Sequence, residues 1–147
     1  MEGLETGRVY RGHFNVVNRG CIENLPADAI VEVPGYIDRN GVNIPIVGDL
    51  PLACAAVCNA SISVQRLAVE AAVAGDDLLL RQAMLMDPLT GAVCDPPEIW
   101  QMTDEMLVAQ AKWLPQYRKA ISEAGKRLKS GKLLPVKKNY RGAARIK

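Results

Sequence analysis

The pattern of apolar and polar positions changes character once along the chain, at Pro51. Before it, residues 15–51 hold short apolar runs that are separated by turn residues. After it, apolar residues recur over stretches long enough for helices of several turns. Short runs bounded by Gly, Pro, Asn and Asp are typical of strands, whereas long periodic stretches are typical of helices. The pattern therefore predicts a small sheet followed by several helices, an α+β fold.

The strand region contains a recognisable hairpin signal. Ala29–Val33 is rich in β-branched residues and stops at Pro34-Gly35. The turn residues of 38–41 (DRNG) separate it from the next apolar run, and Asn-Gly tolerates the positive φ angles of a tight hairpin turn. We therefore expect an antiparallel hairpin of Ile30–Ile37 against Val42–Val47. Pro45 then marks an edge strand or a strand break. A shorter strand is expected at Asn15–Asn18.

Four helical segments are predicted after the sheet. Pro51 suits the first turn of a helix over Leu52–Ala74, and Gly75 suits its C-terminal end. Asp76 is placed to cap a second helix, which Asp87-Pro88 ends. The remaining expected elements are the second helix at Asp77–Met86, a turn at Thr90-Gly91, a third helix opening near Glu98, a break at Pro115 and a fourth helix over Tyr117–Leu128.

Composition and charge place the chain among ordinary globular proteins. Its 147 residues are 49% hydrophobic, which suffices for a buried core and excludes a disordered chain. The net charge of +2 is unevenly distributed, because Lys126–Lys147 holds nine basic and no acidic residues. Such a tail is typical either of a solvated terminus or of contact with nucleic acid, and it lacks aromatic residues arranged for base stacking. We therefore divide the chain at residues 125 and 126 into a globular domain and a basic tail.

Residues able to perform chemistry are few and scattered. Cys54 and Cys58 share a face of the predicted helix and supply two thiolates, but two further zinc ligands at suitable spacing are missing, so small packed thiols explain them better. His13 is the only histidine and has no local partner. Glu32 alternates with Val31 and Val33 and should point away from them. The other carboxylates of this region, Asp28, Asp38 and Asp49, are expected at turns or on the surface.

Several expected signals do not occur in the sequence. It has no glycine-rich dinucleotide loop and no phosphate-binding P-loop. It has no secretory signal, and no stretch is judged long and apolar enough to span a membrane, Leu52–Val64 being the nearest. We therefore expect a cytoplasmic protein with reduced cysteines.

An ordered series of segments extends through most of the chain. The segments are Leu4-Glu5-Thr6-Gly7, Asn15-Val16-Val17-Asn18-Arg19-Gly20, Ile22-Glu23-Asn24-Leu25-Pro26, Val31-Glu32-Val33, Asp38-Arg39-Asn40-Gly41, Val47-Gly48-Asp49-Leu50-Pro51, Val64-Gln65, Val69-Glu70-Ala71-Ala72, Gln82-Ala83, Met86-Asp87-Pro88 and Trp113-Leu114-Pro115. In sequence and order they resemble the C-terminal part of family-four glycoside hydrolases, most of all the α-galactosidase (melibiase) branch. The resemblance covers roughly Leu4 to Tyr117.

The resemblance implies a specific chemistry for the full-length enzyme. Enzymes of this family use NAD and a divalent metal, usually manganese, and hydrolyse glycosides through transient oxidation of the sugar at C3 followed by elimination. Their nucleotide-binding domain, with the metal ligands and the base, precedes the part that this chain resembles. The resemblance therefore assigns no catalytic, NAD-binding or metal-binding residue here, and the chain alone is expected to be inactive and to bind neither cofactor.

What the resemblance does imply for this chain is a role in shaping the enzyme. The C-terminal part of these lactate-dehydrogenase-like proteins forms part of the sugar pocket and much of the contact between subunits, so a homo-oligomer is expected. Asn18, Arg19 and Gly20 lie in the segment expected to approach the sugar. The alternative is a non-enzymatic module that self-associates through the helix Leu52–Ala74.

Overall fold

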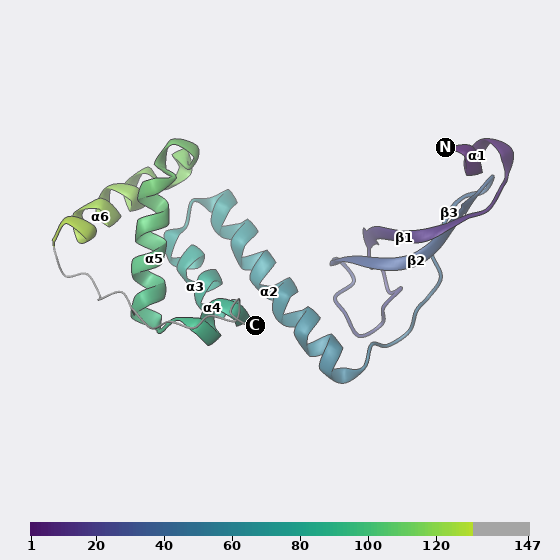
Figure 1. Ribbon diagram of the computed structural model, residues 1–147, viewed down its shortest axis with the longest axis horizontal. Coiled ribbons are helices and arrows are strands. Elements are labelled where there is room, and N and C mark those ends of the chain that lie inside the picture. The colour runs from purple at the N-terminus through teal and green to yellow at the C-terminus, as the bar shows by residue number, and fades with distance from the viewer. Residues whose placement is uncertain (131–147) are drawn as a thin grey trace, which may run out of the picture. The chain divides into compact units, whose positions relative to one another are not determined.

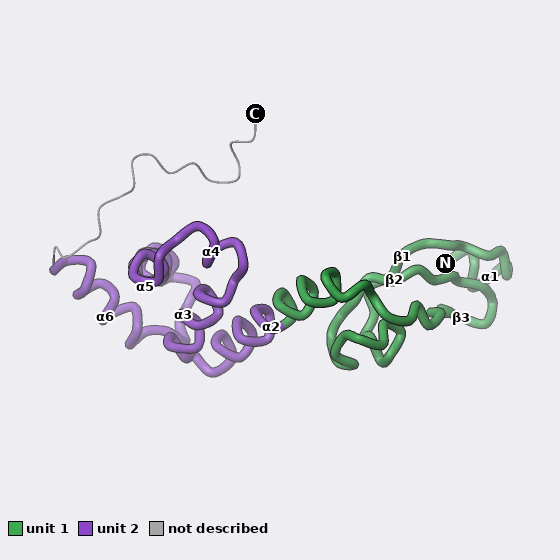
Figure 2. Tube along the Cα trace, turned by 90° about the horizontal axis from the view of Figure 1, so that it is seen from below, with its two compact units in different colours: residues 1–62 green, residues 63–147 purple. Residues whose placement is uncertain are grey.

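The computed structural model describes residues 1–130, and residues 131–147 lie outside the described part. The chain divides into two compact units, residues 1–62 and residues from 63 onward (Figure 2). The first unit holds the sheet, and the second is helical in its described residues. The predicted basic tail begins inside the last helix at Lys126, and its larger part lies beyond the described residues.

The first unit is built on a three-stranded antiparallel sheet in the order β1-β2-β3 (Figure 1). Its strands are β1 (Tyr10–Val17), β2 (Ile30–Asp38) and β3 (Gly41–Asn43). β2 lies in the centre, and its side chains alternate strictly between exposed and buried from Ile30 to Tyr36. Val31 and Val33 point into the core while Glu32 is exposed, as the sequence predicted.

The predicted hairpin is confirmed in its central pairing and wrong in its extent. Ile37 pairs with Val42, but β3 ends at Asn43, two residues before Pro45. The turn is also displaced by one residue, because Asp38 pairs with Gly41 and leaves Arg39 and Asn40 between the strands. Only Gly41 of this turn has a positive φ, 112°. Asp38 stabilises the turn by accepting a 2.8 Å hydrogen bond from the Asn40 amide.

The longest pairing of the sheet was not predicted. β1 covers eight residues and pairs with β2 from Tyr10↔Ile37 to Val17↔Ile30, whereas the sequence indicated a strand only at Asn15–Asn18. Its Gly, His and Arg residues hide the strand pattern. Before it lies the short helix α1 (Glu2–Thr6), which ends at Gly7 with a φ of 79°.

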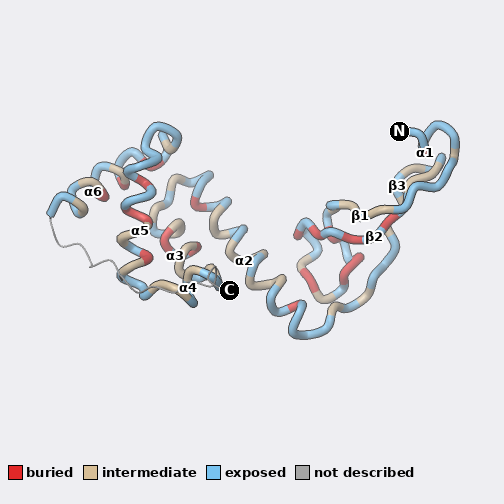
Figure 3. Tube along the Cα trace, in the orientation of Figure 1, coloured by how far each residue is buried: buried red, intermediate tan, exposed pale blue. Residues whose placement is uncertain are grey.

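The core of the first unit gathers one face of the sheet, the loop after β1 and the start of the helix α2 (Leu52–Ala74). Its buried residues, red in Figure 3, are Cys21, Ile22, Leu25, Ala29, Val31, Val33 and Ala55. Gly35 sits where a side chain would collide, since a Cβ there would lie 2.7 Å from Ile44 Cδ1. The small Ala55 likewise lets α2 pack against this core.

The helices of the second unit agree closely with their predicted bounds. α2 and α3 (Asp77–Met86) match the prediction at both ends, and Asp76 caps α3 by accepting from the amides of Leu78 and Leu79. The remaining elements are α4 (Pro88–Val93), α5 (Pro96–Ala109), the 3-10 turns η1 (Ala111–Trp113) and η2 (Pro115–Tyr117), and α6 (Arg118–Lys129). The predicted turn at Thr90-Gly91 is wrong, because Asp87 caps a helix there.

Pro115 breaks the helical run, as predicted, and the two 3-10 turns on either side of it return the chain into α6. The core of this unit is centred on Leu107, Tyr117 and Ala120, with Leu80 packed against them. α5 thus packs on both α6 and α3.

The helix α2 is unusual for its exposed apolar surface. Leu52 and Val73 are 86% and 84% exposed, and Val57 and Val69 are also largely uncovered. These positions do not fall on one face, since they are spread around the helix axis at 100° per residue. By length and composition α2 is a candidate membrane-spanning helix, so the prediction that no stretch meets this test is wrong. The mostly buried core helix of a soluble protein meets the same test.

Candidate functional site

The end of β1 is organised by one buried amide, the side chain of Asn18, which is 1% exposed. Its Nδ2 donates to the carbonyls of Ile22 at 2.8 Å, Leu25 at 3.0 Å and Pro26 at 3.2 Å. Its Oδ1 accepts from the Ile22 amide at 2.7 Å and from the Cys21 thiol at 3.2 Å. The side chain thus replaces the backbone partners that the loop would otherwise lack, and it fixes the loop's path.

This amide holds a turn with an uncommon backbone. Arg19 has a φ of 43°, and it is the one non-glycine residue with positive φ in the described part of the chain. Gly20 follows with a φ of 89°. Backbone bonds hold the turn in place, from the Arg19 amide to the Ala27 carbonyl and from the Cys21 amide to the Asn18 carbonyl, both at 2.8 Å. A left-handed arginine is mildly strained, and such residues concentrate at functional sites.

The three predicted substrate residues line one groove of the first unit, of about 540 Å³. Its other walls are apolar and come from the end of β1 and from the segment around β3. They are Val16, Val17, Cys21, Val42, Ile44 and Ile46. Arg19 supplies the only charged side chain of this lining. Arg19 is exposed, and within residues 1–130 its guanidinium forms no hydrogen bond or ion pair.

Asn18 and Arg19 therefore have different geometries in the groove. The amide of Asn18 forms its hydrogen bonds within its own loop, so it would support ligand binding only by holding the turn in place. The guanidinium of Arg19 keeps its donors available. That Asn18, Arg19 and Gly20 bind a sugar remains a prediction.

The structure leaves the other candidate residues apart from each other. His13 is exposed on β1, Cys54 is exposed on α2, and Cys58 is half-buried one turn further along. All four cysteines are free thiols. Among residues 1–130 no group of three or more His, Cys, Asp or Glu side chains is placed to hold a metal ion. The residues described here therefore do not fit the manganese that the resemblance implies, and we derive no step through a metal.

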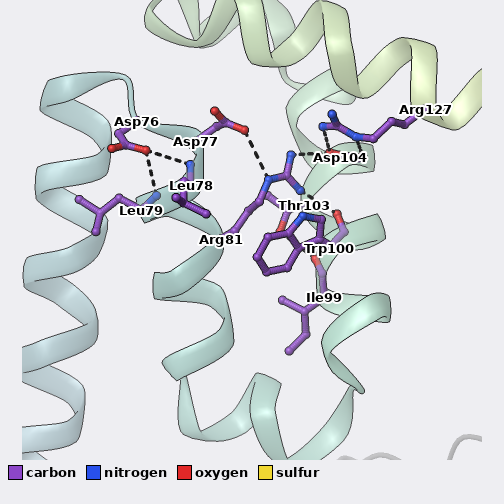
Figure 4. A network of polar contacts seen from close by, with 10 residues as sticks. All are labelled: Asp76, Asp77, Leu78, Leu79, Arg81, Ile99, Trp100, Thr103, Asp104 and Arg127. Carbon is purple, nitrogen blue, oxygen red and sulfur yellow. Dashed lines mark hydrogen bonds and ion pairs between the residues drawn. The ribbon is translucent and has the colours of Figure 1, made fainter.

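The second unit contains a polar network that the sequence did not reveal (Figure 4). Arg81 of α3 is 2% exposed, and its Nη2 lies 2.6 Å from Asp104 Oδ1 of α5. Arg127 of α6 approaches the same carboxylate with Nε 2.7 Å from Oδ2 and Nη2 2.8 Å from Oδ1. Arg81 also donates to the Trp100 carbonyl at 3.1 Å and lies 5.4 Å from the centre of the Trp100 ring.

This network joins three helices and leaves no group free for chemistry. Burial alone would raise the pKa of Asp104, but the hydrogen bonds from Arg127 and Arg81 outweigh it, so its pKa lies below the usual value. Asp104 is therefore ionised and shared between two arginines. One signal was present in the sequence, since Asp77 and Arg81 lie four apart and form an ion pair at 3.4 Å. Nothing in the sequence points to a special role for Asp104, which lies within the predicted third helix.

The fold can now be compared with known proteins. The sequence model of the family 4 glycosyl hydrolase C-terminal domain matches residues 1–90, which include the sheet, the Asn18 turn and α2. This chain belongs to family 4 of the glycosyl hydrolases. The resemblance seen in the sequence is thereby confirmed.

Curated relatives resemble it over most of its length. The chain is 58% identical to an α-galactosidase of Rhizobium meliloti over 145 residues, 99% of this chain and 29% of that protein. It is 36% identical to an α-galactosidase of Bacillus subtilis over 80% of this chain and 27% of that protein. An α-glucosidase of Erwinia rhapontici is likewise 36% identical over 78% of this chain. The chain thus spans less than a third of the length of these relatives.

Solved family 4 structures share its fold. A 6-phospho-α-glucosidase from gut microorganisms, in complex with NAD and glucose-6-phosphate, superposes with a TM-score of 0.66 at 29% identity over 78% of this chain and 25% of that one. The 6-phospho-β-glucosidase of Thermotoga maritima with manganese, NAD+ and glucose-6-phosphate gives a TM-score of 0.67 at 28% identity over 76% of this chain and 28% of that one. The predicted α+β class, a small antiparallel sheet with several helices, is confirmed.

Proposed function

We propose that this chain is the substrate-pocket and subunit-contact portion of an α-galactosidase that depends on NAD and manganese. The observation that carries the proposal is the 58% identity to an α-galactosidase over 99% of the chain. The related 6-phospho-β-glucosidase of Thermotoga maritima was solved with manganese and NAD+, which supports the same cofactors for the complete enzyme. NAD, when bound in that enzyme, supplies the oxidation and reduction of the sugar.

The residues of this chain would act on the sugar from the groove at the end of β1. The five bonds of the Asn18 amide hold the turn rigid. Arg19 then presents an unpaired guanidinium beside apolar walls, an arrangement that suits a sugar, whose ring has an apolar face and hydroxyls at its edge. Because the described residues include neither a metal cluster nor a nucleotide loop, we propose that the 147-residue chain alone does not turn over substrate.

The exposed surface of α2 supports a covered position in a larger enzyme. A helix with apolar residues on every side gains stability only when other surfaces remove them from water. In these relatives, the part that does not align with this chain is more than twice as long as the part that does, so it can provide such a cover. We propose that the cofactor-binding part of the enzyme and a neighbouring subunit share this surface.

A chimera tests the proposal directly. The segment of the Rhizobium meliloti α-galactosidase that aligns with this chain is replaced by residues 1–147, and hydrolysis of p-nitrophenyl α-galactoside is measured. We expect hydrolysis that requires both added NAD and added Mn²⁺, and none from the isolated chain under the same conditions. A folded chimera without α-galactosidase activity would contradict the proposed substrate, and turnover by the isolated chain would contradict its inactivity.

Within the chimera, Arg19→Ala tests the groove. We expect the KM for the galactoside to rise about tenfold to a hundredfold, since a hydrogen bond from a charged group contributes roughly 1.5–3 kcal/mol. Arg11→Ala is the matched control, because Arg11 is an exposed arginine of β1, the strand that leads to the turn, and does not line this groove. Equal KM values for the two variants would remove Arg19 from the sugar site.

A second candidate function is a self-associating module without enzymatic activity, and the exposed apolar residues of α2 are the observation that favours it. Light scattering on the purified chain discriminates: a strict monomer across the micromolar range would argue against it.

Nucleic-acid binding by the tail is the weakest candidate, and most of that tail lies outside the described residues. It predicts a salt-sensitive affinity that deletion of Lys126–Lys147 abolishes.

A further inference from the structure

The turn between β2 and β3 contains the only Asn-Gly pair of the sequence, Asn40-Gly41. This pair indicates a turn, but it also has a chemistry of its own. The side-chain amide carbon of an asparagine can be attacked by the next main-chain nitrogen, which closes a five-membered ring. A glycine in the next position has no Cβ to obstruct this approach. The turn therefore joins an electrophilic carbon to an unhindered nitrogen.

The side chain of Asn40 is unrestrained in the described part of the chain. It is exposed, and within residues 1–130 its amide group forms no hydrogen bond. The main-chain amide of Asn40 donates to Asp38 Oδ1 at 2.8 Å, so this bond holds the main chain and not the side chain. At Gly41 the position that a Cβ would occupy has no heavy atom within 4 Å. Ring closure therefore meets no steric obstacle from the surrounding residues.

The main chain of this turn can also open at little cost. Asp38↔Gly41 is the last pair of the β2–β3 ladder, which has three pairs in all. The terminal pairs of a short ladder separate with a small free energy. Opening exposes the nitrogen of Gly41, and glycine permits the main-chain rotation that ring closure needs.

The other asparagines of residues 1–130 are followed by larger residues, and several are also restrained. Asn18 is 1% exposed, and its amide group makes five hydrogen bonds. Asn43 is half-buried, donates to the Gly41 carbonyl at 3.1 Å and precedes β-branched Ile44. Asn59 donates at 2.9 Å to a carbonyl within α2. The chain thus contains its own controls for the features that distinguish Asn40.

We propose that Asn40 is a site of spontaneous deamidation. The nitrogen of Gly41 loses its proton and attacks Cγ of Asn40, the Cγ–Nδ2 bond breaks, and Nδ2 leaves as ammonia. The resulting cyclic imide takes up one water molecule and opens to aspartate or isoaspartate. Nothing is oxidised or reduced, and water is the only co-reactant. The site does not depend on the proposed glycosidase function, because the reaction needs only these two residues and water.

The modification changes the end of the sheet. In isoaspartate the main chain passes through the former side chain, so it becomes one methylene group longer at the turn. The new carboxylate also lies near Asp38, whose Oδ1 accepts from the Asn40 amide and from Asn43 Nδ2. Like charges at such positions repel each other. The pairing of β2 with β3 should therefore weaken, and with it the wall of the Arg19 groove that Val42 forms.

Incubation of the 147-residue chain in mildly alkaline buffer tests the site. Digestion after glutamate releases residues 33–70, a peptide that contains Asn40, Asn43 and Asn59, and fragmentation in a mass spectrometer measures the conversion of each. We expect Asn40 to convert about tenfold faster than the other two, which corresponds to a barrier about 1.4 kcal/mol lower. The rate should rise with hydroxide concentration, because the attacking nitrogen is deprotonated. Equal rates at the three asparagines, or no conversion of Asn40 in the folded chain, would overturn the proposal.

Two variants separate the ring closure from its consequence. Asn40→Gln keeps an amide but requires a six-membered ring, so conversion should be lost; conversion at the original rate would contradict the cyclic route. Asn40→Asp adds the carboxylate on an ordinary main chain, so its NMR amide signals over residues 36–43 should show retained pairing. The incubated chain should contain a second species in which these signals shift much further. Incubated chain that contains only the Asn40→Asp signals would show that no isoaspartate forms and would overturn the route through the imide.

Discussion

The two units use buried polar groups in opposite ways. In the first unit one neutral amide, Asn18, shapes a turn that leaves the guanidinium of Arg19 without a partner. In the second unit one carboxylate, Asp104, is shared between Arg81 and Arg127 and joins three helices. A site that binds a ligand needs donors that the protein has not used, whereas a scaffold is more stable when every donor is used. The ionic network therefore serves as structural support, whereas the first unit keeps a donor available for the sugar binding that we propose.

The largest effect is expected from Asp104→Asn. The change removes the charge that compensates buried Arg81, and breaking a buried pair in this way costs about 3–5 kcal/mol of unfolding free energy. Urea unfolding followed by circular dichroism at 222 nm measures the loss. The matched control is Asp77→Asn, since Asp77 is 42% exposed and pairs with the same arginine at 3.4 Å. Its loss should stay below about 1 kcal/mol. Equal losses in the two variants would show that the network contributes nothing beyond surface attraction.

The next effect concerns the turn itself, through Asn18→Ala. Several buried backbone groups would lose their partner, so we expect about 3 kcal/mol of destabilisation from the roughly 1–3 kcal/mol that each unsatisfied group costs. Asn24→Ala is the comparison, because Asn24 is half-buried and bonds only the amide and carbonyl of Leu50. Its cost should be about 1 kcal/mol. If Asn18→Ala is no worse than Asn24→Ala, the turn is held by its backbone bonds alone.

Acid should weaken the second unit through Asp104. The folded pKa of Asp104 is lowered, so its stabilising contribution is complete above the unfolded value of about 3.9 and is lost as the pH falls through the folded value. We expect the urea concentration at the unfolding midpoint of the native chain to decrease as the pH is lowered below about 4. Asp104→Asn should flatten this part of the profile. An unchanged acid slope in that variant would place the titrating group elsewhere.

The smallest effect is expected from Arg19→Gly. Glycine adopts positive φ without the steric penalty, so the folded chain should gain up to about 1 kcal/mol even though unfolded glycine is more flexible. The same change should raise the galactoside KM in the chimera, which separates binding from stability. Arg11→Gly, near the start of β1, should instead destabilise the chain by about 0.5–1 kcal/mol. Two losses of equal size would contradict the strain at Arg19.

The sequence predicted elements where local chemistry decides their limits. Pro51 and Gly75 bound α2, and Asp76 and Asp87 bound α3, because caps and prolines act within a few residues. The first part of β1, residues 10–14, was missed because its glycine, histidine and arginine positions do not alternate with apolar ones, and pairing with β2 makes it a strand. Tertiary contacts override local preference in such a segment.

The groove was predictable only in part. The segment of Asn18, Arg19 and Gly20 was selected through its resemblance to the family, but the roles of its members were not predicted. Those roles depend on five hydrogen bonds of the Asn18 side chain to residues up to eight positions away, which leave its amide unavailable to a ligand. The ionic network was less accessible still. Arg81 and Asp104 are separated by 23 residues, and no periodic pattern relates them.

The exposed surface of α2 has a consequence for the life of the chain in a cell. Uncovered valines and leucines on a helix are what chaperones bind and what proteases find when a subunit lacks its neighbours. Surplus copies of this chain would then be removed and assembled copies would persist. The exposed surface of α2 would in this way tie the lifetime of the chain to whether that surface is covered.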